Sequence, residues 1–156
     1  METNEKLIEV LNGLIEINHD RVNGYEKALE EIKDLDTELK DIFRNNADNS
    51  SRYASQLSNL VSGFGGVPAD GTTNSGKLYR VWMDVKTTFT GQDAKSVLEL
   101  CEFGEDAAQK AYKAALASES GMDANTRNII TDQQIKLNAA HFIIKKYRDS
   151  LKEIHS

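Results

Sequence analysis

The sequence predicts an all-α fold: a four-helix bundle with a long crossover that contains a short extra helix. Three observations favour this fold. Apolar residues recur at steps of three and four through four long segments, proline occurs only once, and one glycine-rich segment divides the chain into two halves. We expect the long helices at residues 4–32, 37–62, 92–117 and 124–154, within one domain spanning 1–156.

The first half is predicted to be an antiparallel hairpin, because only a short polar link joins its two helices. Its first apolar stripe is broken once, at Asn18, and its second turns polar at Ser50. Asp36 is suited to cap the second helix. The apolar positions of the two stripes are Leu7, Leu11, Leu14, Val22, Tyr25, Leu29, Ile32, Leu39, Phe43, Tyr53, Leu57 and Leu60.

The crossover spans residues 63–91 and begins with a glycine-rich stretch. Residues 77–89 are predicted to form the short extra helix, which carries Tyr79, Trp82 and Phe89. These aromatic side chains either cover the bundle or meet another chain, since aromatic residues are favoured at the centres of interfaces. A crossover of this length returns the chain to the opposite end of the bundle. The second and third long helices are therefore expected to run parallel.

The second half repeats the first weakly, at an offset of 87 residues. The offset superimposes Tyr25 on Tyr112 and Leu29 on Leu116, as two related hairpins would. Short links again make the two helices antiparallel. The apolar positions of their stripes are Val97, Leu98, Cys101, Ala108, Tyr112, Leu116, Ile130, Leu137, Ile144 and Leu151.

Every long helix turns polar at its midpoint, which predicts a buried polar layer across the bundle. The residues at this height are Asn18, Ser50, Glu105, Asn138 and His141, with Gln134 one turn away. A buried polar group without a partner costs about 1–3 kcal/mol, and an isolated carboxylate costs more. Glu105 therefore needs a partner. His141 is the best placed, and Arg21 and Arg52 compete with it by helical phase.

The second-half residues of this layer resemble the metal ligands of the ferritin-like superfamily. Members of that superfamily are four-helix bundles in which each half supplies a Glu and then a Glu-x-x-His from its next helix. Glu105 and His141 match that order, whereas Asn138 replaces the second Glu. In the first half, the matching positions hold Asn18, Ser51 and Ala54.

Longer segments resemble one group of bacterial ferritin-like proteins of unknown function. They are LIEINHDRVNGYEKAL, YRVWMDVKTTFTGQD and LELCEFGEDAAQKAY, and the resemblance covers nearly the whole chain. The resemblance implies the ferritin-like fold. It carries no settled activity, and a stress-related role follows from it only by analogy.

Two functions remain open. A di-metal centre needs about six carboxylate or imidazole ligands, and the stripes supply one of each. We therefore expect a non-catalytic structural or protein-interaction role without a cofactor, in which the polar layer fixes helix register. The alternative is a metal-binding protein or oxidase that binds iron or manganese at Glu105, Asn138 and His141, supported by Glu102 and Gln134.

Composition excludes several partners. The net charge is −6 without a basic cluster, which disfavours nucleic acid and anionic membrane surfaces. Cys101 is the only cysteine and is expected to be a buried hydrophobe. With neither a signal-peptide pattern nor a long apolar segment in the sequence, we expect a cytoplasmic protein. A second copy of the chain or another protein is the expected partner.

Overall fold

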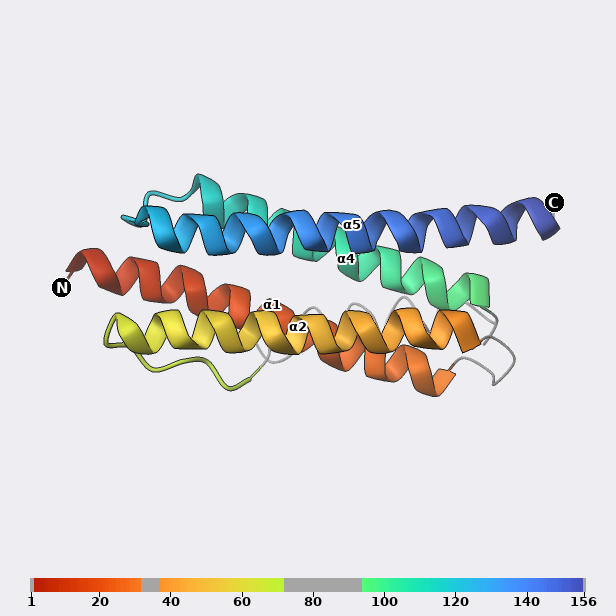
Figure 1. Cartoon of the computed structure of the whole chain (residues 1–156), viewed down its shortest axis with the longest axis horizontal. Helices are drawn as coiled ribbons and strands as arrows, with labels where there is room; N and C mark the ends of the chain where they lie inside the picture. The colour runs from red at the N-terminus through yellow and green to blue at the C-terminus, as the bar shows by residue number, and fades with distance from the viewer. Residues whose placement is uncertain (1, 32–36, 72–93, 156) are drawn as a thin grey trace.

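A computed structural model describes residues 2–31, 37–71 and 94–155 (Figure 1). It contains four long helices in these ranges, and their bounds differ from the predicted ones by at most two residues. The predicted extra helix at 77–89, with Tyr79, Trp82 and Phe89, lies outside the described residues, as does the proposed cap Asp36. The helices are α1 (Glu2–Glu31), α2 (Thr37–Gly63), α4 (Ala94–Ala117) and α5 (Ala124–His155).

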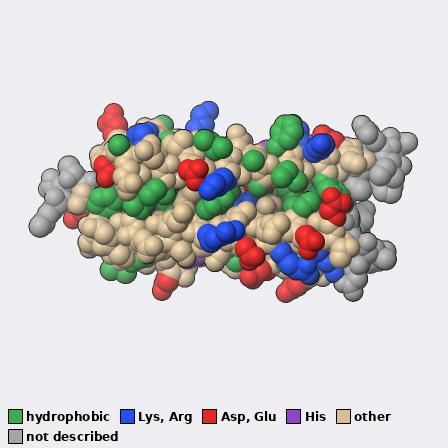
Figure 2. Space-filling model, in the orientation of Figure 1, with side chains coloured by type: hydrophobic (Ala, Val, Ile, Leu, Met, Phe, Trp, Pro, Cys, Tyr) green, Lys and Arg blue, Asp and Glu red, His purple; other side chains and the backbone are tan. Residues whose placement is uncertain are grey.

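The four helices form two antiparallel hairpins that pack into a bundle, and α2 runs parallel to α4, as predicted (Figure 1). Helix α1 packs against both α2 and α4, whereas α2 and α5 make the fewest contacts. A groove of about 510 Å³ follows that weak seam. Figure 2 shows hydrophobic side chains along the seam and basic ones beside its middle. In the described ranges, no helix has an apolar stretch that could cross a bilayer.

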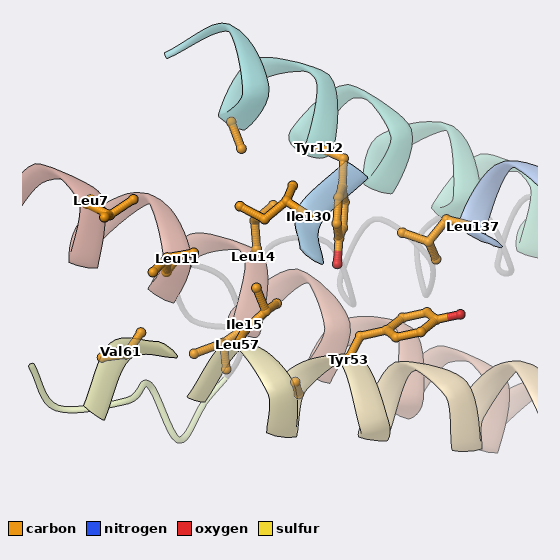
Figure 3. Close-up of a cluster of buried hydrophobic side chains, with 12 residues drawn as sticks. Leu7, Leu11, Leu14, Ile15, Tyr53, Leu57, Val61, Tyr112, Ile130 and Leu137 are labelled. Atoms are coloured by element: carbon orange, nitrogen blue, oxygen red, sulfur yellow. The ribbon is translucent and has the colours of Figure 1, made fainter. Parts of the chain in front are cut away.

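The hydrophobic core is divided into two clusters. The larger one lies near the start of α1 and the end of α2, and Figure 3 shows Tyr112 of α4 directing its ring into it. The smaller lies near the other end of the bundle. The larger cluster comprises Leu7, Leu11, Leu14, Ile15, Tyr53, Ala54, Leu57, Val61, Tyr112, Ala115, Ile130 and Leu137. The smaller comprises Tyr25, Ala28, Leu39, Phe43, Ala47, Leu98, Cys101 and Ile144.

Helix α2 ends in a glycine motif. The amide of Gly66 donates to the carbonyl of Val61 at 2.9 Å, and the amide of Gly65 donates to that of Ser62 at 3.0 Å. This pair of bonds is a Schellman motif, which needs a left-handed residue, and Gly65 has φ 87°. A Cβ on Gly66 would lie 2.8 Å from Ile8, so the loop passes too close to α1 for a side chain.

The start of the crossover is tied to α1. The side chain of Asn12 donates to the carbonyl of Val67 at 3.1 Å and accepts from the amide of Ala69 at 2.8 Å. Further along α1, Nδ1 of His19 lies 2.7 Å from the carbonyl oxygen of Gly71, which makes this nitrogen the donor. The chain therefore leaves α2 and runs back along its own hairpin.

Helix α5 begins with a side-chain cap. Oδ1 of Asp123 accepts a hydrogen bond from the amide of Thr126 at 2.9 Å. Hydrogen bonding from Thr126 holds the pKa of the Asp123 carboxyl below its ordinary value. An aspartate two or three residues before the amide that it accepts from is typical of a helix N-terminus.

Candidate functional site

A polar belt separates the two hydrophobic clusters. On each helix, the polar residues of this belt lie between a residue of one cluster and a residue of the other. On α5 this position is His141, whose side chain is 20% exposed. The other three helices contribute fully buried residues, namely Asn18 and Arg21 on α1, Ser50 on α2 and Glu105 on α4.

Arg21 and Glu105 form an ion pair at the centre of this belt. Nε of Arg21 donates to Oε1 of Glu105 at 2.8 Å, and a terminal nitrogen of the same guanidinium donates to the same oxygen. Its other terminal nitrogen donates to the hydroxyl of Ser50. Both charged side chains are 0% exposed. One guanidinium therefore links α1 to both α2 and α4.

Tyr25 completes this group. Its hydroxyl donates to Oε1 of Glu105 at 2.6 Å, and its ring lies 5.3 Å from Cζ of Arg21, within cation–π range. Burial raises the pKa of Tyr25 well above its ordinary value, and the Glu105 carboxylate raises it further. Burial alone would lower the pKa of Arg21, but the Glu105 carboxylate raises it above its ordinary value. The guanidinium therefore stays charged.

Glu105 also affects Cys101, one turn earlier on α4. Burial, and then the nearby carboxylate, raise the pKa of this thiol well above its ordinary value. Cys101 is fully buried and is the only cysteine of the sequence. A buried thiol with a raised pKa is a poor nucleophile, so Cys101 acts as a core residue.

A second hydrogen-bond chain joins all four helices without using a charge. Nδ2 of Asn18 donates to the hydroxyl of Tyr112 at 2.8 Å, and that hydroxyl donates to Oε1 of Gln133 at 2.7 Å. Nε2 of Gln133 then donates to Oε1 of Gln56 at 2.9 Å. Burial raises the pKa of Tyr112, which therefore remains a donor.

The two groups are related by the internal repeat. The offset that superimposes Tyr25 on Tyr112 also superimposes Asn18 on Glu105. In the structure, the tyrosine of each half bonds to the polar residue of the other half: Tyr25 to Glu105 and Tyr112 to Asn18. The belt thus holds one charged group and one neutral group, and each is built from residues of both halves.

The residues predicted as metal ligands lie in different surroundings. Nε2 of His141 is 3.6 Å from Oδ1 of Asp106, which is 60% exposed, so the partner of Glu105 is the competing Arg21 and not His141. Asn138 is exposed and Gln134 is half-buried. Glu102 forms an ion pair with Arg148 of α5. The buried amide on α5 is Gln133, next to the predicted Gln134.

These surroundings do not fit a metal centre of the ferritin-like kind. In the part of the chain that the structure describes, no three His, Cys, Asp or Glu side chains come together as a group that could hold a metal ion. Oε1 of Glu105 already accepts from Arg21 and Tyr25. Among the described residues, Oε2 of Glu105 and Oδ1 of Asn18 accept no hydrogen bond. One carboxylate oxygen beside a guanidinium is a poor ligand set for a divalent cation.

Sequence reasoning missed the tyrosines and Gln133 as members of the belt. Periodicity assigns Tyr25 and Tyr112 to the apolar stripes, although the repeat superimposes them together with Asn18 and Glu105. That shared offset was the available signal. Gln133 and Gln134 both fit a step of three or four from Ile130, so spacing alone did not distinguish them.

Three solved structures share this fold. One is a mutant of Dps1 from Mycobacterium smegmatis, with a TM-score of 0.82 and 9% sequence identity, and the match covers 94% of this chain and 97% of that chain. Another is the dodecameric thioferritin described as the bacterioferritin-related protein of Bacteroides fragilis, with a TM-score of 0.78 and 16% identity over 97% of this chain and 89% of that chain. The third is a ferritin-like, diiron-carboxylate protein from Bacillus anthracis, with a TM-score of 0.61 and 17% identity over 100% of this chain and 99% of that chain. The protein therefore has the ferritin-like four-helix fold. At these identities, the similarity extends to the fold alone.

The family is shown by the sequence. Residues 6–118 match the model of a domain of unknown function (DUF2383), and the chain belongs to that family. No curated protein matches the sequence significantly.

Proposed function

We propose that this protein is a non-catalytic member of the ferritin-like fold with a structural or protein-interaction role. The observation that carries the proposal is the fully buried ion pair between Arg21 and Glu105. It stands at half-height in the bundle, the height at which ferritin-like proteins with metals hold them. In this chain, a guanidinium supplies the positive charge there.

The chemistry of the ion pair supports a permanent role for the arginine. A guanidinium has five donors in one plane, stays protonated, and here satisfies Glu105 and Ser50 together. A divalent cation at Glu105 would have to displace it, which would leave a second buried charge without a partner. Removing one partner from a buried ion pair costs about 3–5 kcal/mol. Metal binding at Glu105 would have to offset this cost, which lowers the affinity for a metal ion.

Metal loading tests the proposal. Purified protein is incubated anaerobically with Fe(II) or Mn(II), dialysed, and submitted to elemental analysis beside the Glu105→Ala variant. We expect the wild type and the variant to retain equal, small amounts of metal, no more than the dialysis buffer contains. Stoichiometric metal in the wild type that disappears in Glu105→Ala would contradict the proposal.

The same experiment decides the alternative that the sequence leaves open. Metal binding at Glu105, Asn138 and His141 requires that Glu105→Ala and His141→Ala each abolish retention. Metal that survives both changes would place the binding elsewhere on the chain. The interface predicted at Tyr79, Trp82 and Phe89 is a separate part of the proposed interaction role, and light scattering of the wild type and Trp82→Ala tests it.

A further inference from the structure

Helix α5 exposes an apolar stripe that borders the groove between α2 and α5. Of the large hydrophobic side chains that the structure describes as exposed, Ile135, Phe142 and Ile143 lie on this helix and are 62%, 69% and 50% exposed. Ala139, also exposed, lies among them at helical spacing. Apolar side chains grouped in this way on a soluble bundle are typical of an interaction surface. Figure 2 shows hydrophobic groups on the face that α5 presents to the viewer.

The residues of this face are arranged symmetrically about Ala139. Ile135 lies four residues before Ala139 and Ile143 four residues after it, while Phe142 lies three residues after it. Asp132 lies seven residues before Ala139 and Lys146 seven residues after it, and these two side chains carry opposite charges. The intervals of three, four and seven all fall on one face of a helix.

We propose that α5 pairs with α5 of a second copy of this chain, antiparallel, with the two-fold axis at Ala139. In such a pair, a residue that precedes Ala139 by a given interval meets the residue that follows Ala139 by the same interval on the other chain. Ile135 would pack on Ile143 and Phe142 of the other copy, and the reciprocal contact would form on the other side of the axis. The small side chain of Ala139 lets the helices approach at the crossing point.

Charge favours this arrangement over a parallel one. In the antiparallel pair, Asp132 faces Lys146 of the other copy twice, once on each side of the axis. Asp132 and Lys136 already form an exposed ion pair at 2.9 Å, with 59% and 57% of the side chains exposed, so the carboxylate is oriented along this face. A parallel pair in the same register would instead place each charge beside an identical one.

The inferred dimer supplies a partner, a second copy of this chain, for the proposed protein-interaction role. In this respect the inference rests on the proposed function. It involves none of the residues of the buried belt. Oligomeric state and metal content are separate measurements, so either proposal can fail without the other. A single helix pair buries less area than a standard protein interface, and we therefore expect a dimer that dissociates on dilution.

Sedimentation equilibrium over a range of protein concentrations tests the pairing. We expect the wild type to change from monomer to dimer as concentration rises. Ala139→Glu places two carboxylates face to face at the axis and should weaken association by about tenfold or more, the equivalent of 1.4 kcal/mol. Ala114→Glu makes the same change at an exposed position of α4 and should leave association unaltered. Circular dichroism checks that both variants keep their helices.

Disulfide formation tests the register. Ala139→Cys should form a reducible covalent dimer on mild oxidation, because the two thiols meet at the axis, whereas Ala114→Cys should not. A wild type that is monomeric at every concentration would overturn the inference, even if a different protein binds this face. A dimer that is unaffected by Ala139→Glu, or that Ala139→Cys does not cross-link, would also overturn it.

Discussion

The two tyrosine-centred groups at the middle of the bundle occupy equivalent positions but have different chemistry. Tyr25 donates to the carboxylate of Glu105, and Tyr112 accepts from the amide of Asn18. The charged group needs the guanidinium of Arg21, and the repeat places Ala108 at the equivalent position in the second half of the chain. The neutral group is instead completed by Gln133.

This difference shows two ways of building a polar layer at one height of the bundle. Where an acid stands, a counter-charge is buried with it, and the pair links three helices. Where an amide stands, ordinary hydrogen bonds continue the chain to α5 and α2. Both solutions satisfy most buried polar atoms, but they differ in how much stability depends on one side chain.

The largest effect is expected from removing the counter-charge. Arg21→Leu leaves Glu105 buried without a cation, and we expect the free energy of unfolding to fall by about 3–5 kcal/mol at pH 7. Urea denaturation measures the change. Arg44→Leu, on the exposed face of α2, is the matched control and should lie within about 0.5 kcal/mol of the wild type. Equal effects of the two changes would mean that burial of the ion pair contributes nothing.

A second change would introduce a charge into the neutral group. Asn18→Asp places a carboxylate beside Tyr112, while the guanidinium of Arg21 is already paired with Glu105. Burial should therefore raise the pKa of this new carboxyl. At pH 7 we expect a loss of about 3 kcal/mol, since each unit of pKa shift corresponds to about 1.4 kcal/mol.

The pH dependence of the Asn18→Asp variant follows from the direction of this pKa shift. A carboxyl whose pKa is raised on folding contributes stability that is fully present below its unfolded pKa of about 4. That stability is lost as pH rises through the folded pKa. The difference between Asn18→Asp and the wild type should therefore shrink towards pH 4 in chemical denaturation. The exposed Asn59→Asp is the control and should show little change at either pH. A penalty that is the same at both pH values would show that the new carboxyl is not buried as an anion.

The two tyrosines give a direct pairwise comparison. Tyr25→Phe removes a donor from a buried carboxylate and should reduce the free energy of unfolding by about 2 kcal/mol, because hydrogen bonds to charged groups contribute more. Tyr112→Phe removes a neutral hydroxyl and should cost about 1 kcal/mol. Thermal and urea unfolding of the two variants measure the order. The opposite order would mean that Arg21 satisfies Glu105 without help.

The smallest effect concerns Cys101 at alkaline pH. Its pKa is raised on folding, chiefly by burial and then by Glu105, so the unfolded chain loses this proton first. Stability is therefore complete below the unfolded value of about 8.5 and falls above it, by at most about 1.4 kcal/mol per pH unit. Cys101→Ala should have lower stability overall but a flatter profile between about pH 8.5 and 9.5. Parallel profiles for the two proteins would contradict this assignment.

The fold was predictable from sequence because the apolar stripes and the links between helices both report directly on packing. The same periodicity predicted that Asn18, Ser50 and Glu105 are buried at one level along the bundle axis. Periodicity could not choose between Arg21 and His141 as the partner of Glu105. A long side chain reaches its partner from a neighbouring turn, so helical phase leaves several candidates.

The crossing geometry of the helices resolved that choice. Helix α5 turns His141 towards Asp106 at the side of the bundle, while Arg21 points into the space between α1, α2 and α4. Such rotations depend on packing between helices that are distant in sequence. The same limitation explains why Gln133, and not the neighbouring Gln134, joins the buried chain.

A double-mutant cycle on Arg21 and Glu105 tests most directly whether these two residues act as one structural unit. The free energy of unfolding is measured for the wild type, Arg21→Leu, Glu105→Leu and the double variant. If each side chain is buried only because the other balances its charge, the double variant should be more stable than either single variant, since an apolar pair leaves no isolated charge. Losses that simply add would show that the two side chains are stabilised independently, which would contradict a single structural unit at the centre of the bundle.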